Sequence, residues 1–149
     1  MSNEKSILFP TDFSQTGDEA FELAVSLAKE RQAKLIIVHV EEPPPAYGGG
    51  EMYYGALDPD TKQLSNMLKK IVPDDANVKF EHRLISGSPA GALVRLAKDD
   101  DIDMIVMGTH GRSGLARVLM GSIAEEVVRR APCPVLTYRH QNRLKADSR

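Results

Sequence analysis

The sequence is short of cysteine, of aromatic residues and of long apolar runs. It has one cysteine, Cys133, and no tryptophan, and aromatic residues make up 5% of the chain. A lone cysteine cannot close an internal disulfide, which favours a reducing compartment. No apolar run approaches the length of a membrane span, and residues 1–6 lack the apolar segment of a signal peptide. We therefore expect a cytoplasmic protein that does not act at a membrane.

Neither sign of charge is in marked excess. Lysine and arginine together number 19, aspartate and glutamate 21, and the formal net charge is −2. General nucleic-acid binders carry a clear positive excess, so this balance argues against nucleic acid as a partner. The 149 residues are 42% hydrophobic, which is enough for a real core. We expect one domain over residues 1–149, with a frayed basic tail at 139–149.

Short apolar runs alternate with amphipathic stretches along the chain. The apolar runs predict strands at residues 6–9, 33–40, 78–84, 102–107 and 135–138. The amphipathic stretches predict helices from near Ser14 to Ala28, over 60–72, from Pro89 through Ala97, and from Ser122 to about Ala131. This alternation predicts an α/β fold, a five-stranded parallel sheet with four helices on both faces. The pattern does not determine the strand order.

One segment, residues 43–59, is biased in composition. It contains three consecutive prolines and three consecutive glycines, which exclude regular structure. Tyr47, Tyr53 and Tyr54 could cover a bound base or contact a partner, and a solvated surface loop is an equal alternative.

Residues 104–123 combine a buried strand, repeated glycines and a helix start. The strand ends at Met107, and glycines follow at positions 108, 111, 114 and 121. Ser122 is a candidate N-cap for the helix. No acidic residue occurs in this stretch, whereas His110, Arg112 and Arg117 can supply positive charge. Glycine turns and a helix N-terminus both present backbone N–H groups to anions, so the stretch predicts a phosphate-bearing ligand.

Asp12 follows the first predicted strand directly. Open α/β sheets bind ligands just beyond the carboxyl ends of their strands, so Asp12 is a candidate ligand contact. The alternative is that its carboxylate only caps a turn. Within the glycine-rich stretch, His110 faces either phosphate or solvent. Cys133 precedes the last strand and is expected to be a small packing residue, not a catalytic thiol.

Other nucleotide and metal motifs are absent from the sequence. The P-loop pattern G-x-x-x-x-G-K-[ST] does not occur, and Pro10-Thr11-Asp12 stands where a dinucleotide fingerprint or a pyrophosphatase phosphate loop would begin. His39, His110 and His140 lack metal-ligand spacing. The acidic run 99–103 does not fit an EF-hand loop and is expected to be a solvated turn.

The motifs together resemble the universal stress protein family. Gly108-x2-Gly111-x9-Gly121-Ser122 is similar to the G-x2-G-x9-G-[ST] signature of its ATP-binding members. Phe9–Ser14, His39-Val40 and Ala131–Val135 extend the resemblance over nearly the whole chain. The resemblance implies a three-layer sandwich with strand order 3-2-1-4-5, which brings the loops after the first and fourth strands to one crevice.

The resemblance also implies a ligand, a set of contacts and an assembly. The ligand is ATP, expected with Mg²⁺, with Asp12 at the ribose and Val40 near the adenine. Asp12 could also approach a nucleotide-bound Mg²⁺. The implied nucleotide-binding residues are Pro10, Thr11, Asp12, Val40, Met107, Gly108, His110, Gly111, Arg112, Gly121, Ser122 and Ile123. A homodimer is expected through antiparallel pairing of the final strand, by Val135, Leu136 and Tyr138.

Two classes of function remain open at this point. In the first, the protein is a nucleotide-dependent stress-response or signalling module with little or slow hydrolysis. In the second, it is an enzyme that hydrolyses ATP or transfers its γ-phosphoryl group. Phosphoryl transfer needs a positioned base and a held metal, and Asp12 is the one acid near the predicted site, so binding is favoured. A third, weaker alternative is a different adenosine-containing ligand.

Overall fold

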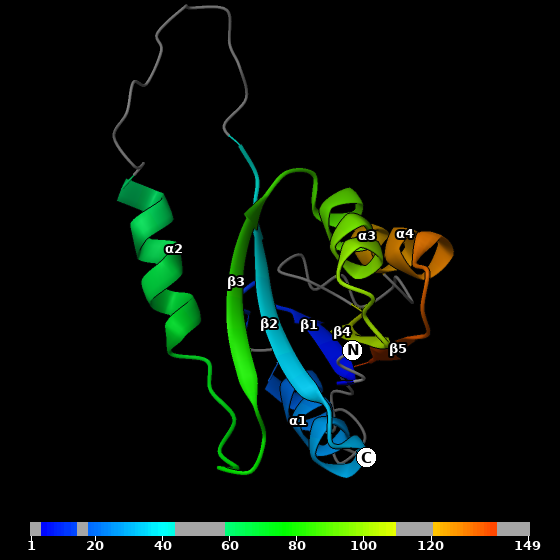
Figure 1. Cartoon of the computed structure of the whole chain (residues 1–149). Helices are drawn as coiled ribbons and strands as arrows, with labels where there is room; N and C mark the ends of the chain where they lie inside the picture. Colours follow the sequence, from blue (N-terminus) through cyan, green and yellow to red (C-terminus); the bar gives the residue numbers. More distant parts are fainter. Residues whose placement is uncertain (1–3, 15–17, 44–58, 110–120, 140–149) are drawn as a thin grey trace, which may run out of the picture.

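The computed structural model describes residues 4–14, 18–43, 59–109 and 121–139. Strands and helices alternate along these residues (Figure 1). The strands are β1 (Ser6–Pro10), β2 (Lys34–Glu41), β3 (Phe80–Ser86), β4 (Met104–Gly108) and β5 (Val135–Tyr138). The helices are α1 (Asp18–Arg31), α2 (Pro59–Lys69), α3 (Pro89–Asp99) and α4 (Ser122–Arg130). The predicted α/β alternation is confirmed.

The five strands form one parallel sheet in the order β3-β2-β1-β4-β5. This is the order that the family resemblance implies. β1 is central, and its Leu8 pairs in register with Ile36 of β2 on one side and Ile105 of β4 on the other. Successive connections run outward from β1 to β3 and then return to β4. The carboxyl ends of β1 and β4 therefore flank the topological switch point, where α/β folds bind ligands.

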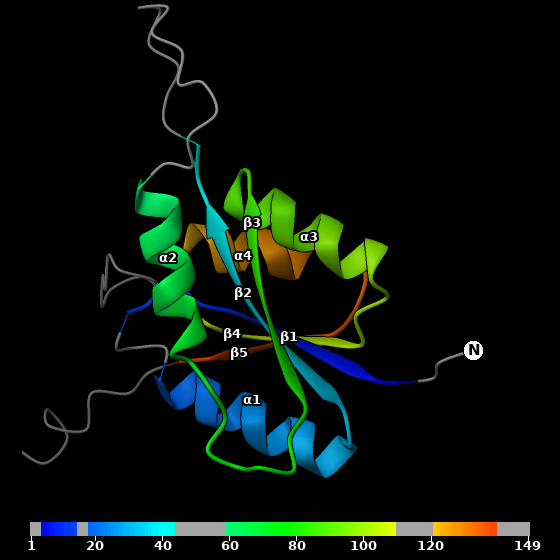
Figure 2. The same ribbon diagram turned by 60° about the vertical axis from the view of Figure 1, so that its left-hand side comes forward.

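Two apolar layers separate the sheet from its helices. On one face, Ile7, Phe9 and Val106 pack with α1 and α2. On the other, Leu8, Ile105 and Met107 pack with α3 and α4. Neighbouring residues of one strand point to opposite faces, which is why an unbroken apolar run is needed in β1 and β4. Figure 2 shows α3 and α4 on one side of the sheet and α1 on the other.

Two predicted details of the helices were wrong. α1 is predicted from near Ser14; its described part runs from Asp18, and residues 15–17 lie outside the described residues. The side chain of Asp12 accepts a 2.9 Å hydrogen bond from the Ser14 amide, which forms an Asx turn before this helix. α2 ends at Lys69 and not at Val72. α4 is capped by Gly121 in an extended conformation, so Ser122 is its first helical residue and not its N-cap.

β3 is a half-exposed edge strand, as predicted, although it begins at Phe80. Its Glu81 carboxylate forms ion pairs with Lys34 and, at 2.7 Å, with the Arg83 Nε. Arg83 also binds Asp100, at 2.8 Å. Charged side chains along an open edge discourage pairing with another chain.

The acidic turn before β4 serves the fold. The Asp103 carboxylate accepts a 2.8 Å hydrogen bond from the Ser6 amide, which fixes the start of β1, while Asp100 pairs with Arg83. Across the described segments, no cluster of histidine, cysteine, aspartate and glutamate is arranged to hold a metal ion. None of the helices described is long and apolar enough to span a membrane.

Candidate functional site

A cleft of about 570 Å³ opens at the switch point of the sheet. Its walls come from the ends of β1, β2 and β4 and from the starts of α3 and α4. Ligand pockets commonly have volumes of ~300–1,000 Å³, so the cleft can hold a nucleotide-sized molecule. The described residues that line it are Phe9, Pro10, Thr11, Asp12, Ser14, His39, Val40, Glu42, Leu64, Pro89, Leu93, Met107, Gly108, Thr109, Gly121, Ser122, Ile123 and Ala124.

The loop after β1 forms the first wall. The Thr11 amide donates a 2.8 Å hydrogen bond to the carbonyl of Val38, which extends the pairing with β2. The Phe13 amide donates to the Thr11 hydroxyl at 3.0 Å, and the Ser14 amide donates to Asp12 Oδ1 at 2.9 Å. Phe13 has a φ of 66°, in the left-handed region that a bulky residue rarely adopts. The carboxylate of Asp12 thus supports a turn and also lines the cleft, so both proposed roles are compatible.

The end of β4 forms the opposite wall. Thr109 is only 6% exposed, and its amide donates to the carbonyl of Tyr138 in β5 at 2.9 Å. Its own carbonyl accepts a 2.6 Å hydrogen bond from the Gly121 amide. The chain therefore leaves the sheet at Thr109 and returns beside it at Gly121. Residues 110–120, which lie outside the described residues, are bounded by this bond.

The start of α4 faces the cleft. The Glu125 amide donates to the carbonyl of Gly121 at 2.9 Å, which is the first intrahelical bond. The amides of Ser122, Ile123 and Ala124 precede it, and first-turn amides have no intrahelical acceptor. All three residues line the cleft. This wall accordingly presents backbone donors and the positive end of the helix dipole, which together favour an anion.

The remaining wall of the cleft is mainly apolar. Val40 follows the buried part of β2, while Leu64 comes from α2 and Leu93 from α3. Pro89 occupies the first turn of α3, next to the extended N-cap residue Ser88. An apolar wall opposite a row of backbone donors suits a ligand with a flat base at one end and phosphate at the other.

Nine of the twelve sequence-predicted site residues meet in this cleft. They are Pro10, Thr11, Asp12, Val40, Met107, Gly108, Gly121, Ser122 and Ile123. The other three, His110, Gly111 and Arg112, lie outside the described residues. The charged side chains among the described lining residues are the acids Asp12 and Glu42.

Several lining residues were not predicted from the sequence. His39 belongs to the family motif His39-Val40 and lacks metal-ligand spacing, but it was not predicted as a site residue; its Nδ1 lies 2.7 Å from the carbonyl oxygen of Thr11. Its position directly before Val40 was the available signal. Leu64, Pro89 and Leu93 belong to helices that are distant in the sequence from the two loops, so nothing in the sequence indicated that they line the cleft.

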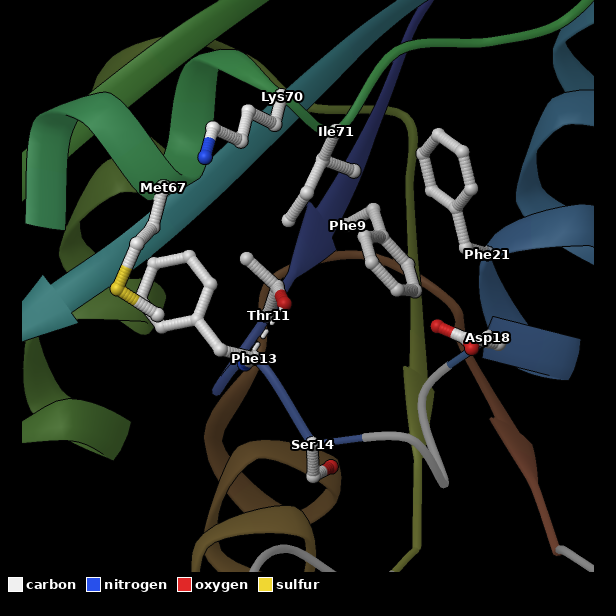
Figure 3. A pocket seen from close by; sticks show the side chains of 9 residues that line it. All are labelled: Phe9, Thr11, Phe13, Ser14, Asp18, Phe21, Met67, Lys70 and Ile71. Atoms are coloured by element: carbon white, nitrogen blue, oxygen red, sulfur yellow. Dashed lines mark hydrogen bonds between the residues drawn. The ribbon is translucent and has the colours of Figure 1, made fainter.

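A smaller cavity of about 270 Å³ lies on the other face of the sheet, between α1 and α2 (Figure 3). Its walls are mainly the apolar side chains of Phe9, Phe13, Phe21, Met67 and Ile71. No glycine is among its described lining residues, and the acid Asp18 stands at the start of α1 there, which does not suit a phosphate group. Phe9, Thr11 and Ser14 line both cavities, so the loop after β1 separates them.

Comparison with known proteins agrees with the fold. Residues 4–139 match the Universal stress protein family. A universal stress protein of Methanocaldococcus jannaschii is 36% identical over 137 residues, covering 89% of this chain and 80% of that protein. The solved structure of universal stress protein UspA from Lactobacillus plantarum is 27% identical, with a TM-score of 0.70, covering 93% of this chain and all of that one.

A second solved structure is described as a universal stress protein in complex with cAMP. It is 26% identical, with a TM-score of 0.67, and the match covers 93% of this chain and 98% of that one. The family match extends over most of the chain, and the fold and strand order agree with it. The chain belongs to the universal stress protein family.

Proposed function

We propose that the protein binds ATP in the cleft between the ends of β1 and β4 and acts as a nucleotide-dependent stress-response module. The observation that carries this proposal is the meeting of nine predicted contact residues around one cleft of about 570 Å³. These residues come from four separate parts of the chain, and the fold brings them together at the switch point of the sheet. A similar protein whose structure contains cAMP supports an adenine nucleotide as the ligand class.

We propose a position in the cleft for each part of the ligand. The phosphates lie at the start of α4, where the amides of Ser122 and Ile123 can donate to their oxygens. The ribose lies near Asp12, whose carboxylate can accept from a hydroxyl group. The adenine lies against Val40 and Leu93, in the apolar part of the cleft.

Charge balance favours a cation with the nucleotide. Asp12 and Glu42 both line the cleft and would repel phosphate at close range. Arg112, predicted in the glycine-rich stretch, and a Mg²⁺ carried by the nucleotide would offset this repulsion. We therefore expect ATP to bind as its magnesium complex.

Retained nucleotide is the most direct test of the proposal. Native mass spectrometry of the purified protein should reveal a bound adenine nucleotide, and calorimetric titration of nucleotide-free protein with Mg-ATP should saturate at one site per chain. Asp12→Ala should weaken the titrated affinity. Asp74→Ala, which removes an exposed acid away from the cleft, is the matched control. Wild-type protein that neither retains nor binds an adenine nucleotide would refute the proposal.

A smaller adenine nucleotide is the second candidate ligand. The related structure with cAMP favours it, since cAMP has the same base and ribose with one phosphate. Competition decides between the two ligands: ATP should displace bound cAMP at lower concentration if the first turn of α4 binds the β- and γ-phosphates. Equal or better binding of cAMP would assign the site to monophosphates.

We also propose a homodimer through β5, which is an edge strand of the sheet. Leu136 is 39% exposed on this strand, and Val128 is 45% exposed on the adjacent α4. Tyr138, which sequence analysis also assigned to the interface, donates a hydrogen bond from its hydroxyl to Glu19 of α1 within the same chain. Leu136 is therefore the main apolar contact that we expect across the dimer. The lone cysteine is compatible with action in the cytoplasm.

A further inference from the structure

His39 connects β2 to the loop after β1. Its Nδ1 lies 2.7 Å from the carbonyl oxygen of Thr11, and its ring lies 4.4 Å from the Phe13 ring, centroid to centroid, at an angle of 41°. A carbonyl oxygen can only accept a hydrogen bond, so Nδ1 carries the proton and donates. One side chain thus holds the loop on both sides of Asp12.

The other side of the loop borders a cavity. Thr11, Phe13 and Ser14 line the 270 Å³ cavity between α1 and α2. Figure 3 shows Phe13 beside Met67 at one side of this cavity, with Phe9 and Phe21 at the other. Side chains that border a cavity lose part of their van der Waals contacts, so the bond from His39 adds restraint to a loop that Phe13 also packs against the core.

The backbone of the loop is also strained. Phe13 has a φ of 66°, and a left-handed conformation at a non-glycine residue persists only when its surroundings hold it. The hydrogen bonds from the Phe13 and Ser14 amides are local and move with the loop. By contrast, the bond from His39 and the bond from the Thr11 amide to Val38 tie the loop to β2, an interior strand of the sheet.

We propose that His39 is a positioning residue of the nucleotide site: by holding Thr11 and Phe13, it keeps the Asp12 carboxylate in place for the ribose. This inference rests on the proposed function and adds to it a residue that acts through the loop. Preorganisation of this kind increases affinity because less order has to be imposed on binding.

His82 provides a matched control within the same chain. Its Nε2 lies 2.7 Å from the carbonyl oxygen of Ile71, and its ring lies 5.5 Å from that of Phe80. The two histidines therefore make the same kinds of contact, a ring N–H to a carbonyl and a ring to a phenylalanine. His82 is on the edge strand β3 and is not among the residues that line the cleft.

The experiment compares three variants by titration with Mg-ATP and by thermal unfolding. His39→Leu removes the donor and should weaken ATP binding about tenfold, the effect of losing one hydrogen bond that orders a site. His39→Asn retains an N–H close to the position of Nδ1 and should recover most of that affinity. His82→Leu should lower the unfolding temperature by a similar amount to His39→Leu while ATP affinity stays within about twofold of wild type.

Amide hydrogen exchange gives a readout without nucleotide. In His39→Leu, the Phe13 and Ser14 amides should exchange faster, whereas His82→Leu should leave them unchanged. Wild-type affinity in His39→Leu would overturn this inference alone, as would equal losses in His39→Leu and His82→Leu. Failure of the wild type to bind any adenine nucleotide would overturn the proposed function as well.

Discussion

The Gly121 amide donates a 2.6 Å hydrogen bond to the carbonyl oxygen of Thr109. This bond joins Thr109, at the end of the β4 wall, to the N-cap residue of α4. The Thr109 amide in turn donates to the carbonyl of Tyr138 in β5. The two ends of the glycine-rich stretch are thereby fixed at the cleft, 12 positions apart in the sequence but adjacent in space. We therefore expect a substitution between them to affect ligand binding without altering the sheet.

Gly111→Asp is the substitution that tests this stretch. We expect it to weaken Mg-ATP binding by about tenfold or more, because the added side chain and its negative charge would lie close to the phosphates at the predicted binding position. Titration calorimetry measures the effect. Gly91→Asp is the control: a Cβ there meets nothing within 4 Å, and an acid in the first turn of α3 is compatible with the helix dipole. Equal affinity of both variants and wild type would remove Gly111 from the site.

Glu81 should contribute to stability only above acid pH. Hydrogen bonds from Lys34, then from Arg83, hold the pKa of its carboxyl below the ordinary value of 4.5. A carboxyl whose pKa is lowered by folding stabilises the native state above its unfolded pKa, and this contribution is lost as pH falls through the folded pKa. Glu81→Gln should therefore cost about 0.5–1 kcal/mol at neutral pH, and less below pH ~4.

Urea unfolding of wild type and Glu81→Gln across pH 3–8 measures this difference. Glu22→Gln on α1, an exposed glutamate, is the control and should show no such pH dependence. A constant difference between Glu81→Gln and wild type over the whole range would mean that the side chain acts through packing and not through its charge.

The strands and helices could be predicted from the sequence because apolar runs and amphipathic stretches are both local patterns. An apolar run such as residues 104–107 indicates a strand covered on two faces, and glycines at 108 and 121 mark its end and the following helix. The strand order came from the family resemblance, since no local pattern specifies which strands pair. The two loops that form the cleft were recognised because each follows a buried strand.

One error has a local cause. The N-cap of α4 was placed at Ser122 because serine is a preferred N-cap type, whereas Gly121 holds that position in an extended conformation. His39 and the helix residues Leu64 and Leu93 reach the cleft only through tertiary packing. Their contribution depends on how helices lie against the sheet, which residue types and spacing do not encode.

Leu136→Asp should convert the proposed dimer to a monomer. Leu136 is 39% exposed on the edge strand β5, and a charge at the centre of an apolar strand pair would be buried without a partner. Light scattering at micromolar concentration measures the mass. Val72→Asp, at an apolar residue that is 48% exposed and lies after α2, should leave the dimer intact. Wild type of monomeric mass, with or without nucleotide, would refute the interface.

Cys133 should react slowly with thiol reagents while the protein is folded. Burial raises the pKa of its thiol, and the nearby negative charge of Asp103 raises it further. Thiolate is the reactive form, so alkylation by iodoacetamide at pH 7.5 should be at least about tenfold slower than for a free cysteine. The rate should recover in urea. Because the chain has one cysteine, the measured rate belongs to Cys133 alone, and a fast folded-state reaction would contradict the packing role.

Bound ATP should remain intact for far longer than a kinase or ATPase would allow. The start of α4 offers backbone donors that contact the ground state and the transition state alike, and such uniform binding does not raise turnover. Asp12 is one of the two described acids that line the cleft, and its Oδ1 already accepts from the Ser14 amide, which leaves it poorly placed to orient a water molecule. Incubation of the protein with Mg-ATP, followed by chromatography of the nucleotides, measures turnover. Rates near ~1–100 s⁻¹, lost in Asp12→Ala while ATP still binds, would establish an enzyme instead of a nucleotide-dependent module.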